Sequence, residues 1–243
     1  MLLATGDTHG SIDMAKLNKQ NFPEQKRLTK NDHVLIAGDF GHIWYPPGHL
    51  NEREQRYYLN DYFPSRKYTT LFIDGNHSNF DLLNTYPDEI WNGGKIHRIN
   101  DSIIHLKRGQ VFEIDGLKVF TMGGAKSIDK AYRKPYISWW PDEEPSNEEL
   151  EEGISNLEKH NWEVDIVVTH TVSERVLDTL IKTGAMKYPE NLNKYFTMLE
   201  NKLKYKKWFF GHFHTDTVID DKTIGLYNEI YNVSEDKYLK SFK

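Results

Sequence analysis

The sequence predicts an α/β fold in which two β-sheets pack face to face with helices outside. Short apolar runs rich in β-branched and aromatic residues alternate with segments of helical periodicity, which is typical of βα units and a largely parallel sheet. Two other parts of the chain carry short strands that indicate hairpins, and in the first of these parts Asn-Asp, Arg-Gly and Asp-Gly turns separate the strands. Two sheets in contact accommodate both kinds of strand.

The alternating part of the chain supplies strands and helices in turn. Strands are expected at residues 2–5, 33–37, 69–73, 165–168 and 207–210. Helices are expected at residues 12–20, 51–62, 78–85, 146–160, 173–182 and 192–204. Ser146, with Glu149 three residues later, and Ser173 are suited to begin two of these helices. The hairpins are expected between residues 95 and 124 and between residues 217 and 233.

Length and composition limit the classes of protein and site. The chain has 243 residues, a net charge of −5, eleven histidines and no cysteine. With no internal repeat or linker, we expect one domain, residues 1–243. A metal site must use nitrogen and oxygen ligands, because there is no thiolate.

The same features predict the setting in which the protein acts. The sequence carries no secretory signal and no apolar run of roughly 18 residues, so a cytoplasmic protein without a membrane partner is expected. Its mild acidity gives no general attraction for nucleic acid, which is expected only as a substrate. The sequence does not define an oligomeric state.

Polar residues follow all five strands of the alternating part. The carboxyl ends of parallel strands share one edge of a sheet, where ligands gather. A glycine beside the polar residue in four of the five cases allows a tight turn and close backbone approach. The candidate metal ligands at these ends are Asp7, His9, Asp39, Asn76, His170, His212 and His214.

Seven ligands are too many for one tetrahedral metal ion. Asp39 could bridge two ions held roughly 3.5 to 4 Å apart, an arrangement suited to phosphoester hydrolysis. Mixed imidazole and carboxylate ligation suits Mn, Fe, Zn, Co or Ni better than Ca or Mg. His77, next to Asn76, would then be free to act as general acid or to contact the phosphoryl oxygen.

The ordered motifs resemble those of the calcineurin-like metallophosphoesterase superfamily. They are Asp7-x-His9, Gly38-Asp39, Gly75-Asn76-His77, Thr169-His170 and Gly211-His212-x-His214. The resemblance implies a four-layer αββα sandwich of two mixed sheets flanked by helices, and a centre of two divalent ions, with Mn²⁺ expected first. It assigns Asp7, His9, Asp39 and His214 to one ion, and Asp39, Asn76, His170 and His212 to the other. It makes His77 the catalytic histidine that protonates the leaving oxygen.

Two motifs depart from the protein phosphatases of this superfamily. The second motif usually continues Asp-x-x-Asp-Arg-Gly, whereas residues 39–44 read Asp-Phe-Gly-His-Ile-Trp. The third usually ends in an acidic residue and here ends in Ser78. The acid that orients the catalytic histidine and the arginine that clamps the phosphate are therefore missing from those positions. His42 and Asp74 are candidates for the partner of His77.

The segment 123–146 is expected to be a functional loop, because it is long, lacks periodicity and is rich in basic and aromatic residues. In the superfamily, loops in this position border the active site. Arg133, Lys126 and Lys130 are candidates to replace the phosphate clamp. Trp139, Trp140 and Tyr136 are candidates to stack on a ring of the substrate.

The resemblance implies a metal-dependent hydrolase that cleaves a phosphate ester by attack of a hydroxide bridging the two ions. The missing Asp-Arg pair favours a phosphodiester or nucleotide substrate. A phosphomonoesterase similar to serine/threonine protein phosphatases is one alternative. A non-catalytic, metal-dependent binding module is another. Five other histidines are expected to be structural or at the surface: His33, His49, His97, His105 and His160.

Overall fold

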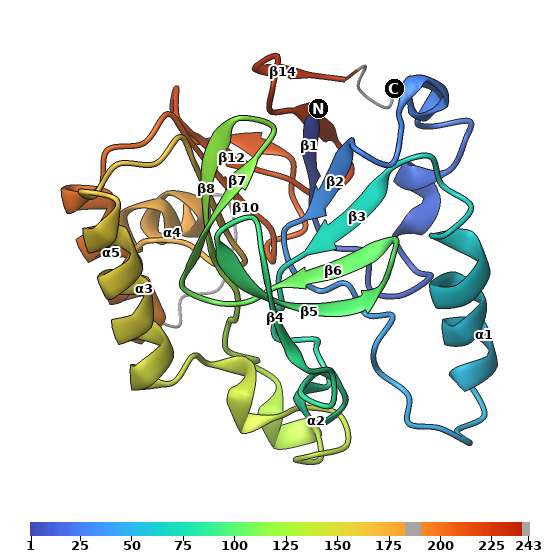
Figure 1. Cartoon of the computed structure of the whole chain (residues 1–243). Coiled ribbons are helices and arrows are strands. Elements are labelled where there is room, and N and C mark those ends of the chain that lie inside the picture. Colours follow the sequence, from blue (N-terminus) through green and yellow to red (C-terminus); the bar gives the residue numbers. More distant parts are fainter. Residues whose placement is uncertain (183–190, 240–243) are drawn as a thin grey trace.

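Two mixed β-sheets form the centre of the molecule in the computed structural model, which describes residues 1–182 and 191–239 (Figure 1). Within these residues the larger sheet has the strand order β14-β13-β1-β2-β3-β6-β5-β4 and the smaller has β11-β12-β10-β9-β8-β7. Strands β1, β2, β3 and β6 run parallel, as do β8, β9, β10 and β12. Antiparallel strands complete both sheets.

The strands of the larger sheet are β1 (Leu2–Thr5), β2 (His33–Ile36), β3 (Thr69–Phe72), β4 (Asp88–Trp91), β5 (Gly94–Asn100), β6 (Ile103–Leu106), β13 (Ile230–Asn232) and β14 (Lys237–Tyr238). Those of the smaller sheet are β7 (Gln110–Ile114), β8 (Leu117–Met122), β9 (Ile166–Thr169), β10 (Lys207–Phe210), β11 (Thr217–Val218) and β12 (Thr223–Gly225). The helices are α1 (Glu52–Tyr57), α2 (Phe80–Leu83), α3 (Asn147–Lys159), α4 (Glu174–Ile181) and α5 (Asn191–Lys202). A π-helical turn (Tyr58–Tyr62) follows α1, and short 3-10 helices span Met14–Leu17, Pro23–Arg27, Lys130–Tyr132 and Pro141–Glu143.

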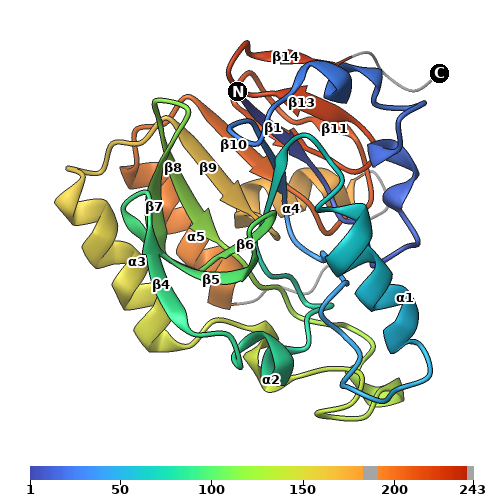
Figure 2. The same cartoon turned by 45° about the vertical axis from the view of Figure 1, so that its right-hand side comes forward.

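The core lies in layers that follow from this arrangement. Side chains such as Leu35 and Leu71 of the larger sheet pack against Val119 and Phe209 of the smaller one, so the sheets are face to face. The outer face of the smaller sheet is covered by α3 and α5, while α1 lies on the side of the larger sheet (Figure 2). The predicted αββα sandwich is confirmed. No helix in the described parts of the chain is both long and apolar enough to cross a membrane.

Helix starts follow the local signals in the sequence. Ser146 and Glu149 form a reciprocal capping box at the start of α3. The hydroxyl of Ser173 accepts a hydrogen bond from the Val176 backbone N–H at the start of α4.

Some expected elements are shorter or differently placed. The helix expected at residues 12–20 is only the 3-10 turn Met14–Leu17, because Asn18 Oδ1 accepts hydrogen bonds from the backbone N–H groups of Gln20 and Asn21. The helix expected at residues 78–85 is reduced to α2, and β4 was not predicted.

The final run at residues 217–233 is not one hairpin. β11 and β12 join the smaller sheet, whereas β13 pairs with β1 in the larger one. Sheet membership here depends on partners far away in sequence, which local turn signals do not specify.

Candidate metal centre

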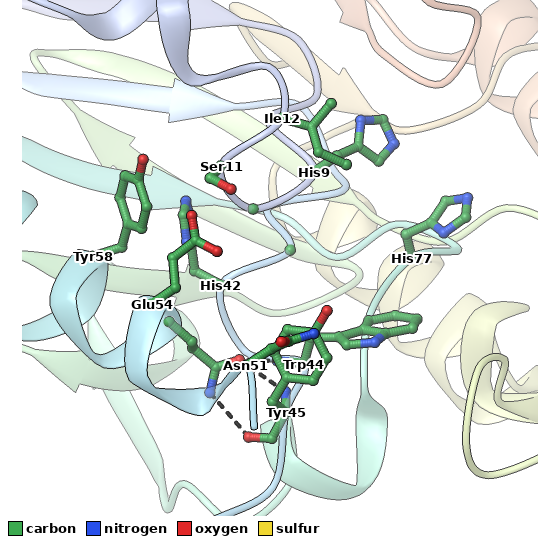
Figure 3. A pocket seen from close by; sticks show the side chains of 13 residues that line it. His9, Ser11, Ile12, His42, Trp44, Tyr45, Asn51, Glu54, Tyr58 and His77 are labelled. Atoms are coloured by element: carbon green, nitrogen blue, oxygen red, sulfur yellow. Dashed lines mark hydrogen bonds between the residues drawn. The ribbon is translucent and has the colours of Figure 1, made fainter. Parts of the chain in front are cut away.

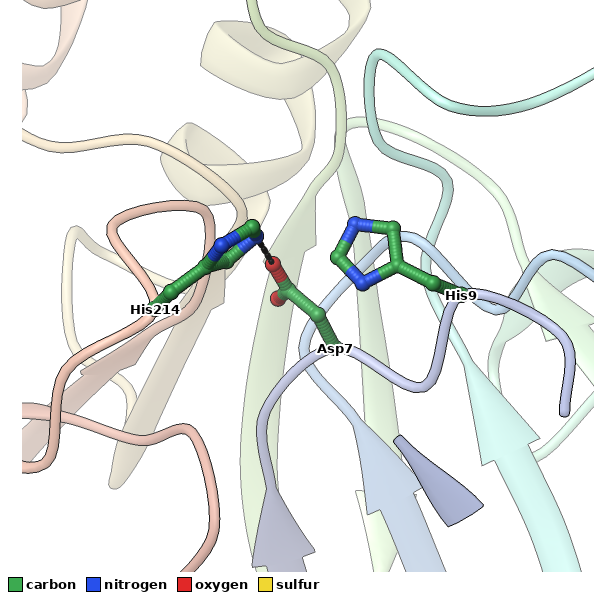
Figure 4. A group of neighbouring side chains, drawn as sticks. All are labelled: Asp7, His9 and His214. Atoms are coloured by element: carbon green, nitrogen blue, oxygen red, sulfur yellow. Dashed lines mark ion pairs between the residues drawn. The ribbon is translucent and has the colours of Figure 1, made fainter. Parts of the chain in front are cut away.

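The polar residues that follow β1, β2, β3, β9 and β10 converge at one edge, where the carboxyl ends of strands from both sheets meet. Asp7, which follows β1 in the chain, is fully buried and lies between His9 and His214 (Figure 4). Nε2 of His214 is 3.3 Å from Asp7 Oδ2. One ligand atom from each of these three residues lies within 4.8 Å of the others. They form a compact set of two imidazoles and a carboxylate.

Asp39 lies at the middle of the centre and is also buried. Its Oδ2 is 3.2 Å from His9 Nε2 and 3.3 Å from His170 Nε2. Oδ1 of Asn76 is 3.1 Å from the same nitrogen of His170. Asp7, Asp39 and His170 form a second close group of ligand atoms. Asp39 therefore faces both groups, the position that a bridging carboxylate requires.

His212 and His77 also lie at this edge. The His212 backbone N–H donates to both oxygens of Asp7, at 3.0 and 3.1 Å, and its ring centroid is 5.0 Å from that of His170. Among the described residues, its ring belongs to none of the close ligand groups. The ring of His77 belongs to a third group with His9 and Asp39. The structure thus brings all seven expected ligands and His77 into one region.

The centre concentrates negative charge away from water. Burial by itself favours the neutral acids, but the neighbouring His170 lowers the pKa of both Asp7 and Asp39. Burial likewise opposes the charge of His170, yet Asp39 and Asp7 raise its pKa to about 9. Buried carboxylates edged by imidazole nitrogens are a donor set that fits divalent transition-metal ions.

Hydrogen bonds fix which atom each ligand presents. Nδ1 of His170 lies 2.9 Å from the Ala37 carbonyl, and Nδ1 of His9 lies 2.8 Å from Asp13 Oδ2. Both rings therefore present Nε2 to Asp39. The amide nitrogen of Asn76 donates to Ser127 Oγ at 3.1 Å, which leaves Oδ1 toward the centre.

Asp13, Ser127 and Tyr227 were not predicted from the sequence. The Tyr227 hydroxyl donates to Asp13 Oδ1 at 2.9 Å, and its ring stacks on that of His214 at a centroid distance of 5.0 Å. The sequence offers one local signal for Asp13, its position four residues after His9, but this position falls in the segment expected to be a helix. Tyr227 gives no such signal, because it is more than 200 residues from Asp13 in sequence.

Backbone conformation at the centre is unusual for non-glycine residues. His9, Asp39, His212 and His214 have φ angles of 43°, 46°, 68° and 47°. The left-handed region is costly for side chains other than glycine and concentrates at functional sites. Gly38 has a φ of +103°, and a Cβ there would lie 2.0 Å from His170 Nδ1. Glycine at this position therefore permits the imidazole to approach.

The loop at residues 123–146 borders a cavity of about 400 Å³ on the open side of the centre. His77, Asn76 and Asp39 line it together with Lys126 and Arg133. Two nitrogens of the Arg133 guanidinium each lie 3.3 Å from a ring nitrogen of His77. Asp129 accepts from Arg133 Nε at 2.8 Å and so holds the side chain in place.

The other candidates in the loop face elsewhere. Lys130 pairs with Glu143 at 2.8 Å, and that buried carboxylate also accepts from Ser127. Trp140 is buried, with its indole N–H donating to Asp81 at 2.7 Å. Tyr136 is exposed. Lys130 and Trp140 therefore support the loop from within.

Neither expected partner of His77 contacts it. His42 is buried against Phe40, Tyr58 and Phe63, where burial lowers its pKa to about 3. Asp74 forms a buried ion pair with Arg108 at 2.6 Å and lies 3.2 Å from His105.

The side chain that faces His77 is Arg133. Burial lowers the pKa of His77 and the positive charge of Arg133 acts in the same direction, whereas Asp39 opposes them.

Comparisons with known proteins agree with this geometry. The family model "Calcineurin-like phosphoesterase" matches residues 1–216. One solved crystal structure aligns over 100% of this chain and 98% of its own, with a TM-score of 0.51 and 12% sequence identity, and thus shares the fold. The search of curated proteins found no match.

Proposed function

The chain belongs to the calcineurin-like phosphoesterase family, and on that premise we propose that it hydrolyses a phosphodiester or nucleotide with two divalent metal ions. Asp7, His9, Asp39 and His214 would hold one ion. Asp39, Asn76, His170 and His212 would hold the other. The observation that carries the proposal is the convergence of buried Asp7 and Asp39 with these imidazoles at one edge. We expect Mn²⁺, with Fe, Zn, Co and Ni as alternatives.

The protein's own side chains have distinct tasks in this proposal. When bound, the ions would supply positive charge for the phosphoryl oxygens and lower the pKa of water. Arg133 and Lys126, in the same cavity as His77, would bind the phosphoryl oxygens. His77 would donate a proton to the leaving alcohol.

The preference for a diester rests on the second motif. Residues 39–44 lack the acid and arginine of the protein phosphatases. Within residues 1–182 and 191–239, the one guanidinium that lies against His77 is that of Arg133. A monoesterase is the second candidate, because Lys126 adds a second cation to the cavity and a monoester carries more negative charge. A binding module without activity is disfavoured, because His77 remains within reach of Asp39.

Metal removal and two substitutions test the proposal. Protein stripped with a chelator should hydrolyse neither bis-p-nitrophenyl phosphate nor p-nitrophenyl phosphate, and Mn²⁺ should restore activity. Asp39→Asn should abolish restoration, and His77→Ala should lower kcat by roughly 10²- to 10⁴-fold. His160→Ala, on α3's C-terminal end, serves as the control and should retain activity. Equal hydrolysis by the stripped and loaded protein would contradict the mechanism.

The preference between ester classes is tested in the same assay. The Mn²⁺-loaded protein should turn over the diester with the higher kcat/KM. A higher kcat/KM for the monoester, together with turnover of a phosphopeptide, would instead support the second candidate. Full metal binding without turnover of any of these esters would support the binding module.

A further inference from the structure

A second cavity, of about 330 Å³, lies beside the centre and shares His77 with the loop cavity. Figure 3 shows His9 and His77 at one side of it, with His42 and Tyr58 opposite and Trp44 and Tyr45 below. Its volume is at the lower end of the range for small-molecule sites, roughly 300 to 1,000 Å³. A group bound here would adjoin the reacting phosphorus.

The two cavities differ in charge. Lys126 and Arg133 line the loop cavity. Among the described residues that line the second cavity there is no lysine or arginine, and the one carboxylate is that of Glu54. A phosphoryl group is therefore favoured in the loop cavity, and an uncharged group in the second one.

Aromatic side chains form much of the second cavity's wall, and packing and backbone hydrogen bonds position Trp44 and Tyr45. Trp44 packs edge-on against buried Trp140 at a centroid distance of 5.2 Å. Gln55 on α1 accepts from the backbone N–H groups of Trp44 and Tyr45, at 2.7 and 2.8 Å, and donates to the Tyr45 carbonyl at 3.0 Å. A preformed wall of this kind suits stacking of a flat ring.

Several polar groups of this cavity are not used by the fold. The side chains of Ser11, Asn51 and Glu54 make no hydrogen bond or ion pair within the described residues. Nε2 of buried His42 is likewise without a partner there. Carboxylate and amide groups can accept hydrogen bonds from sugar hydroxyls, as acidic residues do in dinucleotide-binding proteins.

We propose that the second cavity binds a nucleoside, so that the alcohol released by hydrolysis is a nucleoside hydroxyl. This inference rests on the proposed function. The base stacks on Trp44, and Glu54 and Asn51 accept hydrogen bonds from the sugar. In the reaction, the bond between phosphorus and the nucleoside oxygen breaks and a bond from water oxygen to phosphorus forms. His77, at the junction of the two cavities, gives its proton to the nucleoside oxygen, and the water supplies the proton that restores it.

The first test compares two diesters, dithymidine monophosphate and bis-p-nitrophenyl phosphate, in the Mn²⁺-loaded protein. Trp44→Leu and Glu54→Gln should each lower the ratio of their kcat/KM values, dinucleoside over bis-aryl, about tenfold. Trp44→Phe should recover most of the loss, because it keeps a ring. Glu148→Gln, a matched change on α3 away from the cavity, should leave the ratio unchanged. An unchanged ratio in both cavity variants would overturn the inference.

The second test measures binding without turnover, which separates this inference from the proposed function. Calorimetric titration of the metal-loaded protein with thymidine should show binding that Glu54→Gln weakens about tenfold. Benzyl alcohol, a ring without a sugar, should bind more weakly than thymidine. Equal binding of the two, unaffected by Glu54→Gln, would show an apolar-group site and overturn the inference. Thymidine binding without turnover of any ester would instead contradict the proposed function alone.

Discussion

Asp13 contacts two aromatic side chains of the candidate metal centre, those of His9 and Tyr227. One oxygen lies 2.8 Å from His9 Nδ1, and the other accepts from the Tyr227 hydroxyl at 2.9 Å. Tyr227 in turn stacks on His214. The Asp13 carboxylate therefore orients His9 directly and holds the Tyr227 ring against His214. Such partners fix the ring orientation and raise the basicity of a ligating histidine.

Removing this carboxylate should weaken metal binding without removing a ligand. Asp13→Ala is expected to raise the Kd for Mn²⁺ roughly 10- to 100-fold. Tyr227→Phe should have a smaller effect, because it loses one hydrogen bond but keeps the stacked ring. Calorimetric titration of stripped protein measures both, with the exposed Asp101→Ala as control. An unchanged Kd in Asp13→Ala would show that His9 is oriented by other contacts.

The sequence predicted where the candidate ligands lie but not what holds them. Asp7, Asp39 and His170 each follow an apolar strand directly, so their common edge could be inferred from local pattern. The contacts of Asn76 with Ser127, and of Asp13 with Tyr227, join segments about 50 and more than 200 residues apart. No local periodicity encodes such pairs, and the placement of Arg133 against His77 depends on the same kind of distant packing.

At the scale of elements, Arg108 ties together the end of β3, the loop at residues 123–146 and α3. Its guanidinium donates to Asp74 at 2.6 and 2.8 Å, to the Asp142 carbonyl at 2.8 Å and to Glu149 at 3.1 Å. Both Arg108 and Asp74 are buried. The turn that carries Asn76 and His77 begins directly after Asp74, so this ion pair anchors it.

Breaking the pair should destabilise the protein strongly. Arg108→Met leaves Asp74 charged and buried, and is expected to lower the free energy of unfolding by about 3 to 5 kcal/mol in urea denaturation. Arg98→Met breaks the more exposed pair with Glu89 and should cost below about 1 kcal/mol. The double variant Asp74→Asn/Arg108→Met should regain part of the loss. Equal effects of the two arginine changes would contradict an anchoring role for Arg108.

The strands were more predictable than the helices, because a short run of apolar β-branched residues, such as that of β9, indicates a buried strand without reference to distant partners. The segment at residues 12–20 has helical periodicity, yet the side chain of Asn18 accepts a hydrogen bond from the backbone N–H of Gln20 and so ends the helical turn. The Lys16 ammonium points into the molecule and donates to the carbonyls of Asp7 and Tyr227. Tertiary contacts override weak helical propensity there. Likewise, the split of residues 217–233 between the sheets depends on the available edges of β10 and β1.

At the scale of the whole molecule, histidines whose pKa is lowered by burial should make stability depend on pH. Burial lowers the pKa of His33 and His97 to about 4 and that of His42 to about 3. In the unfolded chain each would titrate near 6.5. Between about pH 6.5 and 4 the unfolded state binds more protons, so the free energy of unfolding falls on acidification.

His170 acts in a different pH range in the metal-free protein. Its raised pKa, about 9, contributes stability that is complete below pH 6.5 and is lost as pH rises through 9. Between pH 7 and about 6 it therefore offsets part of the decrease caused by the histidines with lowered pKa, and at lower pH it adds little to the slope.

Urea unfolding of metal-free protein at pH 7, 6 and 5 tests the acid-side dependence. The free energy of unfolding should decrease at each step. His97→Gln should flatten the decrease, because it removes one of these groups while its surroundings, His105, Lys107 and Asp88, remain. His49→Gln, at an exposed position, should leave the slope unchanged. A slope identical to wild type in His97→Gln would show that other groups cause the dependence.

The pairing of β1 with β13 has a consequence for how the protein is made. Leu3 pairs with Asn232 on one side and Val34 on the other, and the candidate ligands extend from Asp7 to His214. Strand β1 therefore lacks one of its two neighbours, and the centre lacks the imidazole of His214, until late in translation. At roughly 5 to 20 residues per second, about 10 to 40 seconds separate the synthesis of Asp7 from that of His214. The nascent chain passes this interval with an open sheet edge at its first strand, and the complete ligand set forms only after most of the chain has been translated.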